Sequence, residues 1–457
     1  MNDDVLRRRL RGFYPQKIFV FAMGLQGEHI LGLDCIERED MLYPRMVKIR
    51  QLLDESLVPD ITSAVKTEFG KSRLSSEIKP GSKVAITAGS RGITDIVAII
   101  SSLVREVKSR GGDPFIVPAM GSHGRATAEG QLQILYDYGI KEDIVGCPII
   151  SSMEVVKVGE TKNGIPVLLD RNARSADHII VLNRVKSHTE FHGEIESGLM
   201  KMIVIGLGKH EGTIISHRFA VKYGNERTIT EIGLCALEKA PIALGVAIIE
   251  NGYGRTAQIT AVEPENFLET EKKLLLLARD KTPKLPFNEF DVLIVDECGK
   301  EISGTGMDTK VLGRIMNIYE EELNHPKITR VVLRTLTEKT HGNALGIGLA
   351  DFVTKKVVDK IDYSATYINC VTAVIPEKAR LPIVCENDKE AVDFAIATAG
   401  PVDFESVKIV WINHTSKLDE MWVSKGLLEE AAEKENLRVI GNEHEMKFDD
   451  DGNLIEI

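Results

Sequence analysis

Short apolar runs alternate with polar, glycine-rich loops along the first half of the chain. Residues 83–88 and 114–118 each form an apolar run that predicts a buried strand, and a polar loop follows each run directly. After the first loop, apolar residues recur at helical spacing from 93 to 107, and Gly111-Gly112 end this predicted helix. A second helix is expected after the second loop. The repeated order of strand, loop and helix predicts a parallel α/β sheet.

The stretch from Val181 to Phe219 gathers basic and imidazole side chains around two apolar runs, 179–182 and 200–207. The first of these runs predicts a third buried strand. The basic and imidazole residues of the stretch include Arg184, Lys186, His188, His192, Lys201, His210 and His217. Taken singly, each could belong to a solvated surface, but packing does not require such a cluster. We therefore expect the strand to deliver its loop into a cleft, on the same rim as the two glycine-rich loops.

The second half continues the α/β alternation after a linker marked by Pro283 and Pro286. Strands are expected near 291–295, 330–334 and 407–412, and helices near 349–361, 387–399 and 426–435. Residues 1–47 predict an irregular leader, and the last residues, from about Asp449, are expected to fray. The fold class is therefore α/β, with two α/β domains and a cleft between them. Residues 1–285 would form an N-terminal domain on a mainly parallel sheet that carries the loops, and residues 286–457 a C-terminal domain that closes the cleft.

Composition narrows the class of protein. A chain of 457 residues with 43% hydrophobic and 27% charged residues is typical of a globular protein with a substantial core. The net charge of −11 argues against nucleic-acid binding and means that an anionic substrate needs a local basic pocket. The six cysteines are widely spaced without a CxxC pair, and no run reaches the ~20 apolar residues of a membrane helix. We expect a cytoplasmic protein with a small-molecule substrate, no membrane or nucleic-acid partner, and a homo-oligomer left open.

The two glycine-rich loops are poor matches to known phosphate-binding motifs. Backbone N–H groups at a helix start can bind phosphate. The sequences Gly-Ser-Arg-Gly at 89–92 and Gly-Ser-His-Gly at 121–124 match neither GxGxxG nor a P-loop. Tight turning explains most of these glycines.

Taken together and in order, five segments resemble the nickel-pincer lactate racemase family. They are the basic loop at 89–92, the Gly-Ser-His-Gly-Arg-Ala-Thr loop at 121–127, Lys-Ser-His at 186–188, the pair at 201 and 217, and the segment 296–308. The resemblance spans about residues 44–441. It implies that His123 and His188 are the two catalytic histidines and that Arg91 binds the substrate carboxylate. It also implies that Lys300 is a further active-site lysine.

The same resemblance implies a cofactor. This is the nickel-pincer nucleotide, a nickel complex of pyridinium-3,5-bisthiocarboxylic acid mononucleotide that is covalently attached when loaded. Lys201 would be the attachment point and His217, sixteen residues later as in the family, the nickel ligand. Gly121 and Ser122 would contact the cofactor.

The function that the resemblance implies is racemisation or epimerisation of a 2-hydroxy acid by proton-coupled hydride transfer. Such a reaction needs a base on each face of Cα with a pKa near neutrality, which suits two histidines. A guanidinium suits the substrate carboxylate because it can bind both oxygens. His192 and His210 are expected to have supporting or structural roles.

Two features depart from the family pattern. Position 124 is Gly, with Arg only at 125, and His188 and Lys201 are thirteen residues apart with 193–198 filling the gap. They indicate a divergent branch whose pocket need not accept lactate. Two alternatives stay open: a catalytically silent relative that binds a small anion or nucleotide, and a metal-dependent hydrolase that uses the same histidines. No HExxH or comparable ligand spacing supports the hydrolase.

Overall fold

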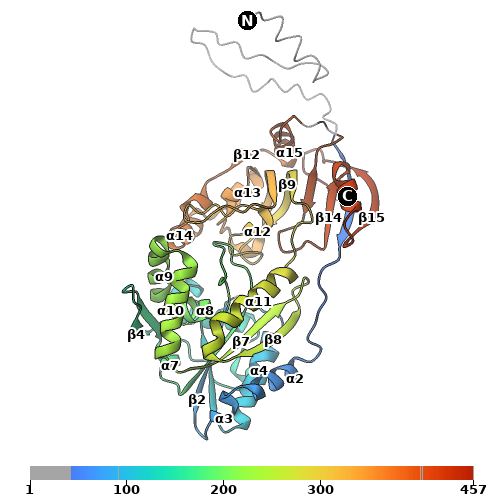
Figure 1. The fold of residues 1–457 in the computed structure, drawn as a ribbon. Helices are drawn as coiled ribbons and strands as arrows, with labels where there is room; N and C mark the ends of the chain where they lie inside the picture. Colours follow the sequence, from blue (N-terminus) through green and yellow to red (C-terminus); the bar gives the residue numbers. More distant parts are fainter. Residues whose placement is uncertain (1–42, 91, 402, 404, 456–457) are drawn as a thin grey trace, which may run out of the picture. The chain divides into compact units, whose positions relative to one another are not determined.

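A computed structural model describes residues 43–90, 92–401, 403 and 405–455. The strands of these residues form two main sheets (Figure 1). Pro44–Ile457 forms one compact unit. Arg91 and nearly all of the predicted leader lie outside the described residues.

The smaller sheet has five strands in the order β3-β2-β6-β7-β8. They are β2 (Lys83–Ala88), β3 (Asp113–Pro118), β6 (His178–Arg184), β7 (Ile242–Glu250) and β8 (Thr256–Val262). The first four strands of this order are parallel, and β8 pairs antiparallel with β7. The three runs that predicted strands in the first half therefore lie side by side, and their loops leave one edge of the sheet. The α/β class and the parallel sheet are confirmed.

Helices and short turns connect these strands. They are α2 (Ile61–Lys71), α3 (Leu74–Glu77), α4 (Ile96–Ser109), η1 (Gly124–Ala126), α5 (Ala128–Asp137), α6 (Glu142–Val145), α7 (Arg171–Arg174), α8 (Leu199–Lys201), η2 (Met202–Gly206), α9 (Lys209–Tyr223), α10 (Asn225–Lys239), η3 (Pro264–Asn266) and α11 (Phe267–Lys281). A separate two-stranded ribbon consists of β4 (Val155–Glu160) and β5 (Pro166–Asp170). The apolar run 200–207 is thus helical, and η2 is a wide π-helical turn.

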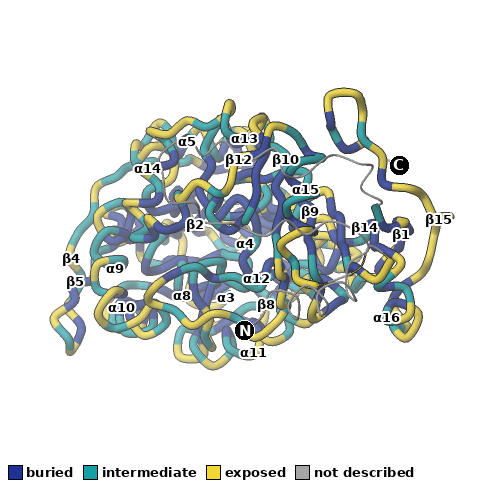
Figure 2. The backbone as a smooth tube through the Cα atoms, turned by 90° about the horizontal axis from the view of Figure 1, so that it is seen from above, coloured by how far each residue is buried: buried dark blue, intermediate teal, exposed yellow. Residues whose placement is uncertain are grey.

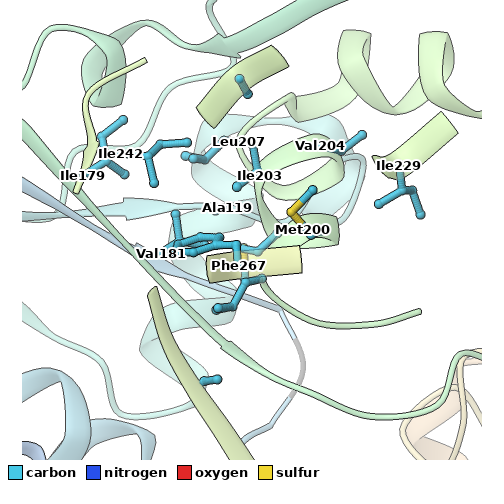
Figure 3. Close-up of a cluster of buried hydrophobic side chains, with 14 of the residues drawn as sticks. Ala119, Ile179, Val181, Met200, Ile203, Val204, Leu207, Ile229, Ile242 and Phe267 are labelled. Carbon is cyan, nitrogen blue, oxygen red and sulfur yellow. The ribbon is translucent and has the colours of Figure 1, made fainter. Parts of the chain in front are cut away.

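Each face of the smaller sheet is buried in its own core. On β6, Ile179 and Val181 belong to one cluster, whereas Ile180 and Leu182 belong to the other. Strands covered on both faces carry continuous apolar runs, which is why the sequence displays them so clearly. The first cluster packs the sheet against α8, η2 and α11, as Figure 3 shows for Val181 of β6, Met200 of α8 and Phe267 of α11.

The larger sheet has eight strands in the order β12-β11-β10-β9-β13-β14-β1-β15. They are β1 (Arg45–Gln51), β9 (Glu289–Cys298), β10 (Lys327–Leu336), β11 (Phe352–Thr354), β12 (Ile383–Cys385), β13 (Ile409–Ile412), β14 (Glu420–Ser424) and β15 (Leu437–Glu445). The strands from β12 to β13 are parallel, and β14, β1 and β15 pair antiparallel. Figure 2 shows the contrast between the mostly buried β9 and the exposed edge strand β15.

Short helices accompany this sheet. They are α12 (Thr309–Leu312), η4 (Glu338–Thr340), η5 (Ile347–Leu349), α13 (Lys355–Asp359), α14 (Tyr363–Thr372), η6 (Pro376–Ala379), α15 (Asp388–Ala397), η7 (Lys425–Leu427) and α16 (Leu428–Ala432). Among the described residues, no helix combines the length and apolar character that a membrane crossing requires.

Two expectations for local structure are wrong. The helix expected over 349–361 is instead a short turn, the strand β11 and the five-residue helix α13, because Phe352 and Val353 pair with β10. The tail after Asp449 does not fray, since Arg334 donates a hydrogen bond of 2.7 Å to the carbonyl of Leu454. The division of the chain into domains at residue 285 stays a prediction. The strand β1, from the first part of the chain, belongs to the larger sheet.

Candidate active site

The three candidate loops lie next to one another at the carboxyl edge of the smaller sheet. They follow the neighbouring parallel strands β2, β3 and β6, so residues 89–95, 119–127 and 185–198 leave the sheet on the same side. Open α/β sheets bind their ligands at this edge. The shared rim that the sequence predicted is therefore present.

His123 lies on the second loop and links it to the first. Its side chain is exposed, and its Nδ1 atom hydrogen-bonds the hydroxyl of Ser90. The preceding residue, Ser122, contacts Nδ1 of His210 with its hydroxyl at 3.0 Å. The loop around His123 is thus tied to both a neighbouring loop and helix α9.

His188 lies on the third loop and contacts Lys201. The backbone N–H of Glu190 donates to Nδ1 of His188 at 3.1 Å. Nε2 itself meets Nζ of Lys201, and the ring packs against Phe191 with centroids 4.6 Å apart. Burial, followed by the charges of Lys201 and Lys186, holds the pKa of His188 well below its usual range. The imidazole is therefore neutral at neutral pH.

His217 belongs to the same electrostatic cluster as His188 and Lys201. Lys201 ends α8, η2 follows it, and His217 lies on α9, so a short helical segment carries both residues. Burial, and then the charge of Lys201, lowers the pKa of His217 to about 4. His217 in turn contributes to the lowered pKa of His188. A neutral imidazole is the form that binds a metal ion.

The protein side chains alone do not form a metal cage. Among the residues that the structure describes, no group of three or more His, Cys, Asp or Glu side chains is placed to hold a metal ion. Three histidines gathered as in a zinc hydrolase are therefore not found in this part of the chain. A single imidazole ligand is compatible only with a metal whose other donors come from elsewhere.

A buried carboxyl group fixes the start of the helix that carries Lys201. Glu271, on α11, is fully buried and accepts a hydrogen bond of 2.9 Å from the backbone N–H of Met200. A Cβ at Gly198 would lie 2.3 Å from Oε1 of Glu271, so only glycine permits this approach. Burial raises the pKa of Glu271 to about 7, and the hydrogen bonds from the backbone of α8 oppose the rise.

A second buried carboxylate, Glu196, shapes the loop that carries His188. The loop is closed at its base by backbone hydrogen bonds between Lys186 and Ser197. Inside it, Glu196 accepts hydrogen bonds from the backbone N–H groups of His188 and Gly193. Two cations from outside the loop complete its coordination, namely Arg279 of α11 and Lys310 of α12, the latter at 3.1 Å. Glu196 therefore links the loop to the second half of the chain.

Three further contacts hold the same loop from the second half of the chain. The Thr309 hydroxyl donates to the carbonyl of Thr189 at 2.7 Å, and the fully buried Lys378 pairs with Glu190. The Asn317 amide donates to the carbonyl of Glu190 at 3.2 Å. These contacts anchor the His188 loop from both sides.

A cavity of about 1030 Å³ borders the His188 loop. Its wall includes Lys186 and Ser187 from that loop and Lys300 from the loop after β9. The Nζ atom of Lys300 donates to the carbonyl of Gly304 at 2.6 Å. The side chains of His123, His188, Lys201 and His217 are not part of the wall formed by the described residues. Lys300 thus shares a cavity with the third loop.

The wall of the cavity is more basic than the protein as a whole. Its charged residues are Arg184, Lys186, Arg279, Lys284, Lys300, Lys310 and Lys417, against Glu250, Glu301, Asp308 and Asp419. Such a wall offsets the net charge of −11 locally and favours an anionic ligand.

Several residues of the site were not found from the sequence. They are Asp170, Glu190, Glu196, Lys209, Glu271, Lys310 and Lys378. The one available signal was a charged residue within an apolar helical pattern, as for Glu271 among the leucines of α11. The other contacts join segments that are distant in the sequence, so no local sequence pattern predicts them.

The fold and the strand-end loops define an α/β protein with a histidine and lysine cluster at the carboxyl edge of a parallel sheet. Residues 43–228 match the family model described as the lactate racemase N-terminal domain. This part of the chain is therefore lactate racemase-like, as its motifs predicted. The matched range includes His123, His188, Lys201 and His217, and Lys300 lies outside it.

The solved structure of the lactate racemase apoprotein from Thermoanaerobacterium thermosaccharolyticum is similar at 12% sequence identity with a TM-score of 0.46. The similarity covers 80% of this chain and 99% of that one. No curated protein matches the chain.

The raised pKa of Glu271 predicts a pH dependence of stability. Because the folded protein binds this proton more tightly than the unfolded chain does, the contribution is fully present below about pH 4.5 and is lost as pH rises through about 7. We expect Glu271→Gln to remove this dependence. Relative to Glu271→Gln, the parent should lose up to about 3 kcal/mol of unfolding free energy between pH 5 and pH 8. Urea denaturation at both pH values measures the difference.

A control for this experiment is Glu269→Gln, two residues away on α11, where the carboxylate is exposed beside Lys272. This variant should follow the parent at both pH values. An equal pH response in the parent and in Glu271→Gln would show that Glu271 does not titrate in this range.

Proposed function

We propose that the protein is a racemase or epimerase of a 2-hydroxy acid. The observation that carries the proposal is the cluster of Lys201, His188 and His217 at the carboxyl edge of the sheet, within the range that matches the lactate racemase domain. The basic wall of the neighbouring cavity supports a substrate with a carboxylate.

The residues fit the nickel-pincer nucleotide of the lactate racemase family. Lys201 offers an amine for covalent attachment, and His217 offers a neutral imidazole as the single protein ligand that the metal of such a cofactor needs. The glycine at 121 and the hydroxyl of Ser122 lie on the loop that packs against α9. Held by Lys201 and His217, the cofactor would supply a hydride acceptor for the substrate Cα.

The two histidines would move the hydroxyl proton. Ser90 engages Nδ1 of His123, so we assign proton transfer by that ring to Nε2. For one enantiomer His123 would take the proton of the substrate hydroxyl, and for the other enantiomer His188 would take it. The lowered pKa of His188 keeps it able to act as a base at neutral pH.

Two cations would bind and orient the substrate carboxylate. Arg91 follows β2 on the first loop and offers two parallel N–H donors. Lys300 approaches from the loop after β9 in the second half of the chain. Because the His188 loop is fixed by Lys310, Lys378 and Thr309, the second half of the chain would also hold the reacting histidine in place.

The covalent attachment of the cofactor to Lys201 is tested by measuring the intact mass of the protein purified from its native host. We expect a covalent adduct in the parent and none in Lys201→Ala, because that variant lacks the attacking amine. Lys222→Ala, with an exposed lysine on the same helical segment, is the matched control and should keep the adduct. His217→Ala should keep the adduct and lose most of the nickel, measured by elemental analysis.

Each outcome of this experiment decides a separate role. An adduct of unchanged mass in Lys201→Ala would place the attachment elsewhere, and full nickel content in His217→Ala would remove it as the ligand. A parent without an adduct that still binds hydroxy acids would favour a silent binding relative.

The two histidines are tested by the stereochemistry of the reaction. We expect His123→Ala and His188→Ala each to lower net racemisation by about 10²–10⁴-fold, because each face of Cα loses its base. Transient reduction of the cofactor should survive with one enantiomer only, and with opposite preference in the two variants. Chiral chromatography and absorbance spectroscopy measure these two quantities.

The control for both variants is His444→Ala, since His444 is exposed on the edge strand β15. Its racemisation rate should equal that of the parent. Undiminished racemisation in either active-site variant would exclude that histidine from the reaction, and a metal hydrolase would show no enantiomer preference at all.

A further inference from the structure

Lys209 combines two features that rarely occur together in one lysine residue. Its side chain is fully buried, and its backbone has a left-handed conformation with φ of 54°. The residue stands where the wide turn η2 gives way to α9. Both features cost free energy, so the surrounding contacts must hold the residue there.

The ammonium group of Lys209 joins three separate segments. Nζ lies 3.2 Å from Oδ2 of Asp170, which is also fully buried, at the end of β5. It donates to the carbonyl of Pro118, the last residue of β3, and to Oε1 of Gln131 at 3.3 Å. Pro118 immediately precedes the loop that carries His123, and Gln131 lies on the helix that follows that loop.

Gln131 extends this contact into the loop itself. Its buried amide donates to the carbonyl of Gly121 at 2.9 Å and to the carbonyl of His123 at 3.3 Å. The loop between His123 and Gln131 is strained, because Arg125 and Ala126 both have positive φ values. The chain of contacts from Lys209 therefore ends on the backbone of His123.

The first turns of α9 support the loop at two further points. Ser122 contacts His210, the residue after Lys209, at 3.0 Å. A Cβ at Gly121 would lie 2.6 Å from the hydroxyl of Thr213, so the loop backbone touches the helix directly. The same helix carries His217. Figure 3 shows Ala119, at the start of the loop, among Ile203 and Leu207 of the preceding turn.

A buried ion pair contributes little net stability compared with apolar residues of similar size, because both charges must leave water. Stabilisation alone therefore gives no reason for Lys209 and Asp170. Their contacts instead hold the end of β3 and, through Gln131, the backbone of His123 against α9.

We propose that Lys209, neutralised by Asp170 and acting through Gln131, is a positioning residue that fixes His123 relative to the His217 helix. The inference rests on the proposed function for its kinetic consequence. The placement of His123 can be measured without any activity.

The test uses the double variant Lys209→Met/Asp170→Asn in the full-length protein. The single Lys209→Met variant would leave an uncompensated buried carboxylate and destabilise the fold, whereas the double variant removes both charges. We expect the double variant to melt close to the parent and to keep the Lys201 adduct. Its kcat should fall by about 10–100-fold with KM little changed, because His123 is displaced while the substrate cations remain.

A readout independent of activity is the NMR signal of His123 in histidine-labelled protein, assigned with His123→Gln. We expect a changed chemical shift and titration midpoint in the double variant. Lys157→Met/Glu160→Gln, which removes an exposed ion pair, is the matched control and should leave both the signal and kcat unchanged.

A second variant covers the case in which the double variant fails to fold. Gln131→Met keeps the ion pair and removes both the donor to Gly121 and His123 and the oxygen that accepts from Lys209, so it should change the His123 signal and lower kcat in the same way. A folded variant of either kind with an unchanged His123 signal and parental kcat would overturn the proposal. A changed signal in a protein that racemises no hydroxy acid would keep the positioning role and reject the proposed function.

Discussion

A carboxylate that has left water completely must receive all of its hydrogen bonds from the protein, and Glu196 is such a group. Its donors come from its own loop, from α11 and from α12. The shape of the His188 loop and the attachment of that loop to the second half of the chain are therefore one requirement. Removing any of these donors would leave part of the Glu196 carboxylate charge uncompensated in a site that water does not reach. The arrangement of the loop is therefore fixed.

The same principle recurs around the other functional loops. Glu271 fixes the start of the helix that bears Lys201, and the pair of Lys209 and Asp170 fixes the loop that bears His123. His188, Lys201 and His123 thus each lie on or next to a segment that contacts a buried charged group. In this protein the buried charges set the positions of the functional groups, and the apolar clusters on the two faces of the sheet supply the rigid support.

The sequence predicted the strands of the smaller sheet and the position of its loops, because strands buried on both faces carry continuous apolar runs. It did not predict β1, since the segment Arg-Met-Val-Lys-Ile-Arg-Gln alternates apolar with charged residues and resembles a surface segment. The helix expected over 349–361 was wrong because a three-residue strand is decided by its partner β10 and not by its own periodicity.

For the candidate site, sequence reasoning reached the residues that resemble a family motif and none of those that hold them. His188 and Lys201 were predicted in one site, and the structure brings them into contact. Glu190 and Lys378, which meet across almost two hundred positions, leave no local pattern that periodicity or composition could detect. Long-range contacts of this kind are fixed by tertiary packing alone.

The place of β1 in the larger sheet has a consequence for how the protein is made. Residues 45–51 are synthesised long before their partners β14 and β15. The larger sheet cannot be completed until β15 has been synthesised, and closing so long a loop slows folding. A fragment that begins after the proline linker would lack the strand between β14 and β15 and would expose two unpaired sheet edges, the situation that favours aggregation.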